Sequence, residues 1–347
     1  MKRLTPKARQ RQIRLFRKKI RRAKKKRRRF RKAAEAWRRY IQIKAPDVFT
    51  VGREDARRKL LRFITRLRTV SAIDKKWVCI DFSGTQKMIA DGTLIFFAEL
   101  SRLRRLMAGH RVRFRCIAPR NAKVAQVLMQ VGIFKLLGFR KKIEATFPDV
   151  IHWRSASGRE VNGEKYDSVL GNYEGRIADV LGKKFFRGVT EAMTNCHHHA
   201  YISIRPDHLN AMDEPSEWWM FSQEKDGCLT VVFCDLGIGI PGSLPVKKPS
   251  LWQRVQTTFG SNLDAHAIQE AIADSRTRTG KHHRGKGLKQ LIDVVSSASD
   301  GRVHIFSNKG CFTLKSGKED ISQFKDSILG TLIHWSVPIG DLTDDTV

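Results

Sequence analysis

From Pro46 onward the chain alternates short apolar runs with longer segments of helical spacing. The run WVCIDFS at 77–83 has the length and composition of a buried strand, and helical spacing follows it over 92–110. A second strand-like run at 111–119 precedes a second helical segment at 121–139. Strands that alternate with helices of this length predict an α/β layer with parallel neighbours.

A second stretch of alternating strands and helices follows a polar segment at 147–171, which we interpret as a linker or extension. It predicts a long helix over 182–201, a strand at 228–235, a hairpin-like pair within 301–317 and a closing strand at 330–338. The predicted organisation is a polybasic arm at 1–45, an α/β unit at 46–146, the linker or extension at 147–171 and a second α/β unit at 172–347.

The first 45 residues hold 22 of the 67 Lys and Arg residues and one of the 34 acids. They have few apolar residues with which to fold alone, so we expect an arm that is disordered, or helical when bound. Its natural partners are polyanions, above all DNA or RNA, and less readily an anionic membrane face. The alternatives are a solubilising tail and an arm that docks on an acidic protein. Nothing in the arm indicates recognition of a base sequence.

The six cysteines lie far apart and form no CxxC pair, which favours reduced and mostly buried thiols. No apolar run approaches the ~20 residues of a membrane span, and no signal-peptide core follows the basic N-terminus. From the sequence we expect a soluble, cytoplasmic protein.

Three short motifs in the second unit carry the chemistry. TEAMTN, ending at Asn195, places a Glu and an Asn four residues apart on one face of the predicted helix. DLGIGIPG puts Asp235 at the end of an apolar strand, before glycines that let a ligand approach the backbone. RGKGLKQL, beginning at Arg284, places glycines at a helix N-terminus, where N–H groups favour phosphate. A Walker A loop is absent, because His282 follows Gly280 and Lys281.

In this order, EAMTN, DLGIGI, RGKGL and GTLIHWSVP resemble the N box, the two glycine boxes and the terminal threonine strand of the GHKL superfamily. This superfamily includes gyrase, heat-shock chaperones, histidine kinases, MutL and the anti-sigma kinases. The resemblance covers about 172–340 and implies the Bergerat fold, a mixed sheet backed by helices. It also implies ATP with Mg²⁺, bound under a mobile lid.

The resemblance assigns a role to each motif residue. Asn195 would be the Mg²⁺ ligand, and Glu191 would be the general base. Asp235 would accept the adenine amino group, and Thr331 would lie near the adenine. The remaining nucleotide-binding residues would be Gly237 and Gly239, which shape the adenine pocket, and Arg284, Gly285, Lys286, Gly287 and Leu288 of the second glycine box.

Two further features border this site. The segment 241–283 is long enough for a lid, and it contains the cations Arg276, Arg278 and Lys281, which either meet phosphate or are solvated. Three consecutive histidines follow Asn195, but successive helix positions point about 100° apart, so they cannot converge on one zinc ion. We expect His198 and His199 to flank the site and His197 to point away.

The segment 80–138 resembles a STAS domain, the fold of anti-anti-sigma factors, in its order of strand, loop, helix, strand and helix. Residues 89–92 stand where phosphorylated STAS domains carry their acceptor serine, and Asp91 takes that place here. Asp91 either holds a constitutive negative charge or caps the helix. We favour the cap.

Four functions remain open. The leading one is a slow ATPase that acts as a nucleotide-dependent switch on a protein partner, with a nucleic-acid-binding arm. The second is a partner-switching serine/threonine kinase or anti-sigma regulator, in which Glu191 takes a proton from a protein hydroxyl. The third is a nucleic-acid-stimulated ATPase related to MutL, and the fourth is a scaffold with a degenerate pocket. A homodimer is compatible with each of them.

Overall fold

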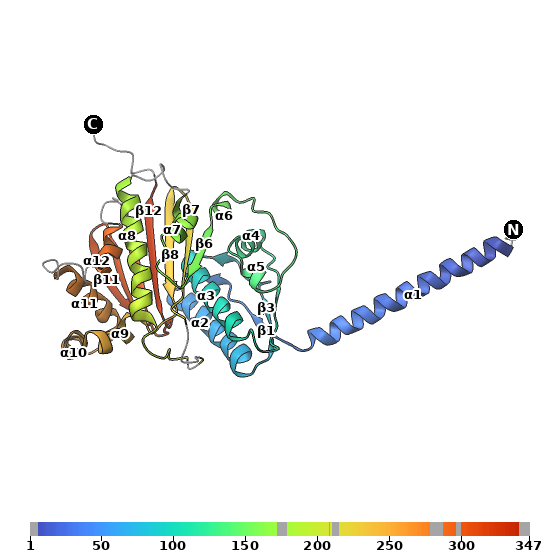
Figure 1. The fold of residues 1–347 in the computed structure, drawn as a ribbon, viewed down its shortest axis with the longest axis horizontal. Helices are drawn as coiled ribbons and strands as arrows, with labels where there is room; N and C mark the ends of the chain where they lie inside the picture. Colours follow the sequence, from blue (N-terminus) through green and yellow to red (C-terminus); the bar gives the residue numbers. More distant parts are fainter. Residues whose placement is uncertain are drawn as a thin grey trace, which may run out of the picture.

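The computed structural model describes residues 6–171, 179–207, 209, 215–277, 287–295 and 300–339. Its elements form successive layers (Figure 1). A seven-stranded sheet carries helices on both faces, and a small parallel sheet lies beyond one of these helical layers. The mixed α/β class predicted from the sequence is confirmed.

The first unit is built on a parallel sheet of order β1-β3-β5. Its strands are β1 Tyr40–Lys44, β3 Trp77–Asp81 and β5 Phe114–Ile117, with a short parallel pair of β2 Val48–Phe49 and β4 Lys87–Met88. Its helices are α2 Glu54–Arg68, α3 Ala90–Leu106, α4 Ala122–Gln130 and α5 Ile133–Leu136. The helix predicted over 121–139 is thus two helices, which separate at Gly132 because its φ of +85° interrupts the helix.

The predicted arm ends too late along the chain. Helix α1, Pro6–Trp37, extends away from the body (Figure 1), but Tyr40 to Lys44 form β1 and pair with β3. The side chains of Tyr40 and Ile43 are buried in the first unit. The boundary at residue 45 is therefore wrong, because the alternating sequence YIQIK contributes a strand to the sheet despite its basic surroundings.

The second unit contains a seven-stranded sheet of order β11-β10-β9-β12-β8-β7-β6. Its strands are β6 Arg154–Gly158, β7 Trp218–Lys225, β8 Cys228–Asp235, β9 Arg302–Ser307, β10 Gly310–Lys315, β11 Lys318–Gln323 and β12 Thr331–Pro338. All six pairings are antiparallel, so the mixed sheet that the resemblance implies for this unit is wrong: parallel and antiparallel pairs occur in different sheets of this protein. The segment 147–171 is an extension, because it supplies the edge strand β6 along with α6 Pro148–Ile151 and α7 Glu164–Leu170.

The large sheet has a hydrophobic core on each face. On one face, Phe233, Ile305 and Ile333 pack with α8 Asp179–Asn195, α11 Leu263–Thr277 and α12 Gly287–Asp293. On the other, Val232 and Leu332 join the core of the first unit, and α3 contacts β7 and β8. Opposite alternating faces of the same strands supply the two cores. The two predicted units therefore share one core across the boundary at residue 146.

A buried ionic cluster accompanies this shared core. Glu99 on α3 pairs with Arg68 on α2 and with Arg205, and all three side chains are buried. Asp207 accepts from Arg102 at 2.6 Å and from Arg205 at 2.9 Å. Each buried charge thus has an opposite partner, as burial of ions requires. The cluster ties α2 and α3 to the segment that follows α8.

No helix in the described part of the chain is long and apolar enough to cross a membrane. The six cysteines are all free, and Cys79, Cys196, Cys234 and Cys311 are buried. This agrees with the reduced, mostly buried thiols expected from the sequence.

Candidate functional site

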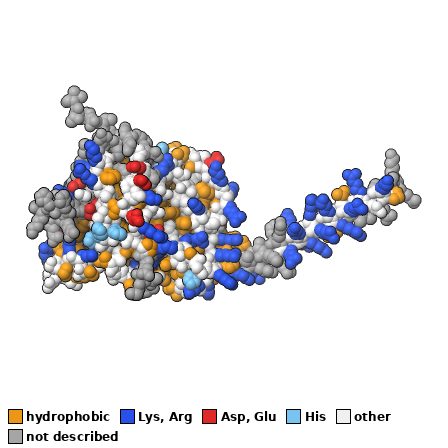
Figure 2. Space-filling model, in the orientation of Figure 1, with side chains coloured by type: hydrophobic (Ala, Val, Ile, Leu, Met, Phe, Trp, Pro, Cys, Tyr) orange, Lys and Arg blue, Asp and Glu red, His pale blue; other side chains and the backbone are white. Residues whose placement is uncertain are grey.

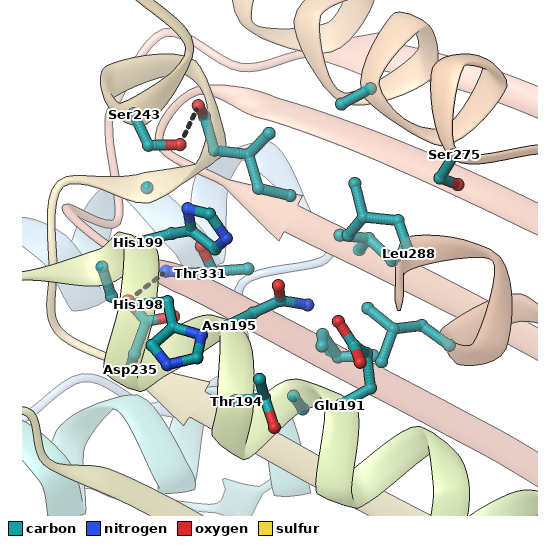
Figure 3. A pocket seen from close by; sticks show the side chains of 18 of the residues that line it. Glu191, Thr194, Asn195, His198, His199, Asp235, Ser243, Ser275, Leu288 and Thr331 are labelled. Carbon is teal, nitrogen blue, oxygen red and sulfur yellow. Dashed lines mark hydrogen bonds between the residues drawn. The ribbon is translucent and has the colours of Figure 1, made fainter. Parts of the chain in front are cut away.

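A cavity of about 950 Å³ lies between the large sheet and the helices α8, α9 (Gly239–Lys247), α11 and α12. Five separate elements bring the predicted site residues to it, as Figure 3 shows for most of them. The predicted residues that line it are Glu191, Asn195, Asp235, Gly239, Leu288 and Thr331. Residues up to 140 positions apart in the sequence therefore share one pocket, since Glu191 and Thr331 both line it.

Glu191 and Asn195 lie on the pocket-facing side of α8. They are one helical turn apart, and their side chains point into the same space (Figure 3). Burial raises the pKa of Glu191, and the nearby Asn195 side chain offsets part of this rise. The Nδ2 atom of Asn195 is buried and has no hydrogen-bond partner in the described structure. An unpaired buried amide facing a cavity is suited to a polar ligand.

Asp235 ends β8 at the floor of the cavity, with 6% of its surface exposed. Its Oδ1 accepts from the backbone N–H of Gly237 at 2.9 Å and from that of Thr331 at 3.3 Å. Burial raises the pKa of this carboxyl to about 6, and these hydrogen bonds offset part of the rise. The carboxylate is fixed in position by two backbone groups and is costly to leave without a further partner.

The loop after Asp235 depends on its glycines. A Cβ on Gly237 would meet the carbonyl oxygen of Ala200 at 2.1 Å, so only glycine fits against the end of the helix that carries Glu191. Gly239 has a φ of +75°, and a Cβ there would meet Ser307 and Asn308 under 3.0 Å. The Ile238 N–H donates to the same Ala200 carbonyl at 2.8 Å. These contacts hold the loop between α8 and β9.

Thr331 and Leu288 complete opposite sides of the cavity. Thr331 is the first residue of β12, lies directly opposite Asp235 in the sheet and contacts the Ser307 hydroxyl at 3.1 Å. Leu288 lines the cavity from α12, whose first residue is Gly287. Arg284, Gly285 and Lys286 of the second glycine box lie outside the described residues.

The histidines border the cavity as predicted. They form the π-helical turn Cys196–Ala200 that continues α8. His198 and His199 line the cavity, whereas His197 does not. Among the described residues, no cluster of three or more His, Cys, Asp or Glu side chains has the arrangement of a metal site.

Sequence reasoning missed two lysines. Lys247 and Lys248, at the end of α9, both line the cavity, and Lys248 pairs with Asp274 of α11 at 2.6 Å. Burial lowers the pKa of His199, and the nearby Lys247, His198 and Lys248 add to this effect. The signal that could have found them is the Lys-Lys pair close behind DLGIGIPG.

The predicted lid segment contains α9, α10 (Pro249–Thr258) and α11, which share a small core around Leu251 and Val255. Arg276 lies in the last turn of α11. The other predicted lid cations, Arg278 and Lys281, lie outside the described residues.

The first unit reaches the rear of this site. Arg57 of α2 is buried, and its guanidinium donates to the carbonyl of Asn308 at 2.8 Å. The Asn308 side chain donates to the Ile238 carbonyl at 2.9 Å and accepts from the Gly330 N–H at 3.3 Å. Arg205, held by the ionic cluster, donates to the Leu329 carbonyl at 3.0 Å. The loop that holds Ile238 is thus braced by Arg57 of the first unit through Asn308, and Leu329 is held by Arg205, which in turn pairs with Glu99 of the first unit.

Asp91, by contrast, lies away from the cavity, in the first turn of α3. It is buried and accepts from the N–H of Gly92 at 2.5 Å and from the hydroxyl of Thr50 at 3.0 Å. Burial raises its pKa. The N-cap of α3 is Ile89, which makes no side-chain capping bond, so Asp91 is an acid in the first turn of the helix and not the predicted cap. Its bond to Thr50 ties α3 to the residues after β2.

No protein-family model, curated protein or solved structure matches this chain. The chemistry of the site therefore rests on its own residues.

Proposed function

We propose that this protein binds ATP with Mg²⁺ in the cavity beneath α8 and α9, as the resemblance to the GHKL superfamily implies, and hydrolyses it slowly. The observation that carries the proposal is the convergence of Glu191, Asn195, Asp235 and Thr331 on one cavity. The buried carboxylate of Asp235, the unpaired amide of Asn195 and the two lysines that line the cavity match the polar groups of a nucleotide.

Each residue that lines the cavity has a separate role in this proposal. Asp235, held by two backbone N–H groups, would accept a hydrogen bond from the adenine amino group. Lys247 and Lys248 would face the phosphates, and the Asn195 side chain would supply an oxygen to Mg²⁺. The metal, when bound, would offset phosphate charge. Glu191 would take a proton from the attacking water, because burial gives it a more basic carboxylate than one in solvent.

Replacing Asp235 by Asn is expected to weaken ATP binding by about 10- to 100-fold. The Asn side chain can keep its oxygen toward Gly237 and Thr331, but its amino group would then face the adenine amino group. Isothermal titration of ATP would measure the loss, with Asp226→Asn in the exposed β7–β8 turn as a matched control. Unchanged ATP affinity in Asp235→Asn would contradict the adenine role.

The same carboxyl predicts a pH dependence. Its pKa in the folded protein, about 6, lies above the ordinary value of 3.8, so the proton is held more tightly in the folded state. ATP affinity should fall as pH drops through about 6, because the protonated carboxyl loses its charge. In the nucleotide-free protein, the stability of the fold changes in the opposite direction. Ionisation of the buried carboxyl lowers the free energy of unfolding as pH rises from about 4 to 6. Asp235→Asn should therefore raise its Tm at neutral pH.

A second candidate function is phosphoryl transfer to a protein hydroxyl, as in the anti-sigma kinases. The packing of the STAS-like first unit against the nucleotide unit favours it, because those two folds meet in that system. Radiolabelled ATP separates the candidates: label on a protein partner indicates a kinase, whereas free phosphate alone indicates an ATPase.

For the arm we propose nucleic acid as the partner. Helix α1 extends from the body and carries Lys and Arg along its length (Figure 2). Its contacts would be with phosphates, which release counterions on binding. Deleting residues 1–36 should weaken duplex DNA or RNA binding at least 100-fold at low salt and flatten its salt dependence, as measured by fluorescence anisotropy. If the deletion left the salt dependence of binding unchanged, the arm would be excluded as the segment that binds nucleic acid.

A further inference from the structure

One face of the small parallel sheet is partly open to solvent: basic and polar side chains on it are exposed, whereas Tyr40 and Cys79 on the same face are buried. Parallel sheets are almost always covered on both faces, so an open face calls for an explanation. The inner face, with Ile43, Val78 and Phe114, joins the core of the first unit. On the outer face Gln42, Lys44, Arg113 and Arg115 are exposed.

Aromatic rings and guanidinium groups gather at the end of this open face where the strands begin. The six residues of this arginine–tryptophan face are Trp37, Arg39, Tyr40, Trp77, Arg113 and Arg115. Tyr40 lies between the two tryptophan rings, with centroids 5.6 Å from Trp37 and 5.2 Å from Trp77. The register of β1 and β3 sets Tyr40 directly opposite Trp77.

The guanidinium groups lie over these rings. Arg113 is 4.7 Å from the Trp77 ring centroid, and Arg39 is 5.7 Å from it on the arm side. Arg115 is 5.4 Å from Tyr40 and 5.7 Å from Trp37. Trp37 remains 42% exposed, which is unusual for so large a ring.

The charge of this face is positive. The acidic side chain on this face is Asp81 of β3, which accepts a hydrogen bond from Gln42 at 2.9 Å. Hydrogen bonds and the charge of Lys44 lower the pKa of Asp81. Lys and Arg side chains gather on the part of the body that adjoins α1 (Figure 2). The exposed Lys and Arg side chains of the open face therefore lie at the end of the arm where α1 stops at Trp37.

We propose that the arginine–tryptophan face binds single-stranded nucleic acid, with an unstacked base on Trp37 and the backbone along Arg113 and Arg115. In a duplex the faces of the bases are hidden in the stack, so aromatic rings on a protein surface can use only unpaired bases. Arginine can stack on a base and pair with phosphate. The arm alone supplies charge, which does not distinguish a duplex from a single strand.

The test uses the full chain and a labelled mixed-sequence oligonucleotide, as single-stranded RNA, as single-stranded DNA and as a duplex, with affinity read by fluorescence anisotropy. Trp37→Ala changes no charge. It should weaken single-strand binding about tenfold and leave duplex binding within about twofold. Trp37→Phe should restore most of the loss, because a phenyl ring still stacks. Comparing the affinities for single-stranded RNA and single-stranded DNA shows whether the face prefers ribose or deoxyribose.

The arginines have a matched control. Arg113→Ala with Arg115→Ala should weaken single-strand binding more than Arg62→Ala with Arg66→Ala, which removes the same charge from exposed positions on α2. Circular dichroism would establish that both double variants fold. Equal losses in the two double variants would overturn the proposal, as would unchanged single-strand binding in Trp37→Ala.

This inference builds on the proposed role of the arm, yet the two fail differently. If the arm deletion abolishes duplex binding and Trp37→Ala changes nothing, the arm binds nucleic acid and the face does not. If the full chain binds no nucleic acid at all, both are wrong. ATP binding is independent of either result.

Discussion

Replacing Glu191 by Gln is expected to lower steady-state ATP turnover by about 10²- to 10⁴-fold, the range for loss of a positioned general base. Gln keeps the size and polarity of the side chain but accepts no proton. The pocket geometry and the Asp235 contacts stay in place, so the Kd for ATP should change by less than about threefold. Phosphate release and ATP titration would measure the two quantities on the same preparation.

A matched control is Glu270→Gln on α11, whose carboxylate pairs with Arg254 on the surface at 2.7 Å and does not line the cavity. It should leave both turnover and binding unchanged. Turnover of Glu191→Gln equal to that of the unmodified protein would exclude Glu191 as the base and would leave it a role in positioning water.

The largest effect on stability is expected from Glu99→Ala, which should lower the free energy of unfolding by about 3–5 kcal/mol. The substitution removes one of the two carboxylates that the buried Arg68 and Arg205 contact and leaves Asp207 alone to offset their charges. Urea unfolding would measure the change. Glu54→Ala, which removes a half-buried acid that pairs with Arg58 at 3.3 Å, should cost about 1 kcal/mol or less. Similar losses of unfolding free energy in Glu99→Ala and Glu54→Ala would contradict the expectation that the buried ion pairs matter more for stability.

Glu99 also fixes the direction of a pH effect. Arg205 and Arg68 hold its pKa well below the ordinary value of 4.5. The ionised carboxylate therefore stabilises the folded protein above pH 4.5, and this contribution is lost as pH falls below that value. The protein should lose stability on acidification, and Glu99→Ala should show a shallower loss over the same range.

The buried arginines give the proposed switch a physical route. Arg205 bonds to the carbonyl of Leu329, two residues before Thr331, and Arg57 bonds to the carbonyl of Asn308, whose side chain donates to the Ile238 carbonyl in the loop after Asp235. A ligand that shifts the pocket floor would therefore change contacts made by α2 and α3. Such coupling needs two arrangements of these loops that the nucleotide distinguishes.

Much of the site could be predicted from the sequence because its signals are local. Glu191 and Asn195 share a face through helix geometry alone, and Asp235 followed by glycines marks a strand end under any fold. The side of the histidine run that faces the cavity also follows from helix periodicity, since His198 and His199 line it and His197 does not. Lys247 and Lys248 could not be placed in this way, because their position depends on how α9 turns back over the sheet.

The limits of prediction in the fold have the same origin. YIQIK was predicted as part of the arm because of its basic neighbours. It forms a strand because β1 is stabilised by pairing with residues 37 positions later in the chain. The polar segment 154–158 forms a strand because it pairs with β7, 60 to 68 residues later in the chain.

Apolar periodicity and glycine positions were enough to establish the mixed α/β class and the order of the main elements, because each depends on neighbours within a few turns. That the motif residues share one cavity was an expectation from the family resemblance, because they come from five separate elements. Only the tertiary structure decided that the first unit packs against the second face of the large sheet, that Glu99 and Arg205 are buried together, and that Trp37, Trp77 and Arg113 meet on one open face. Those arrangements rest on long-range packing, which leaves no periodic mark in the chain.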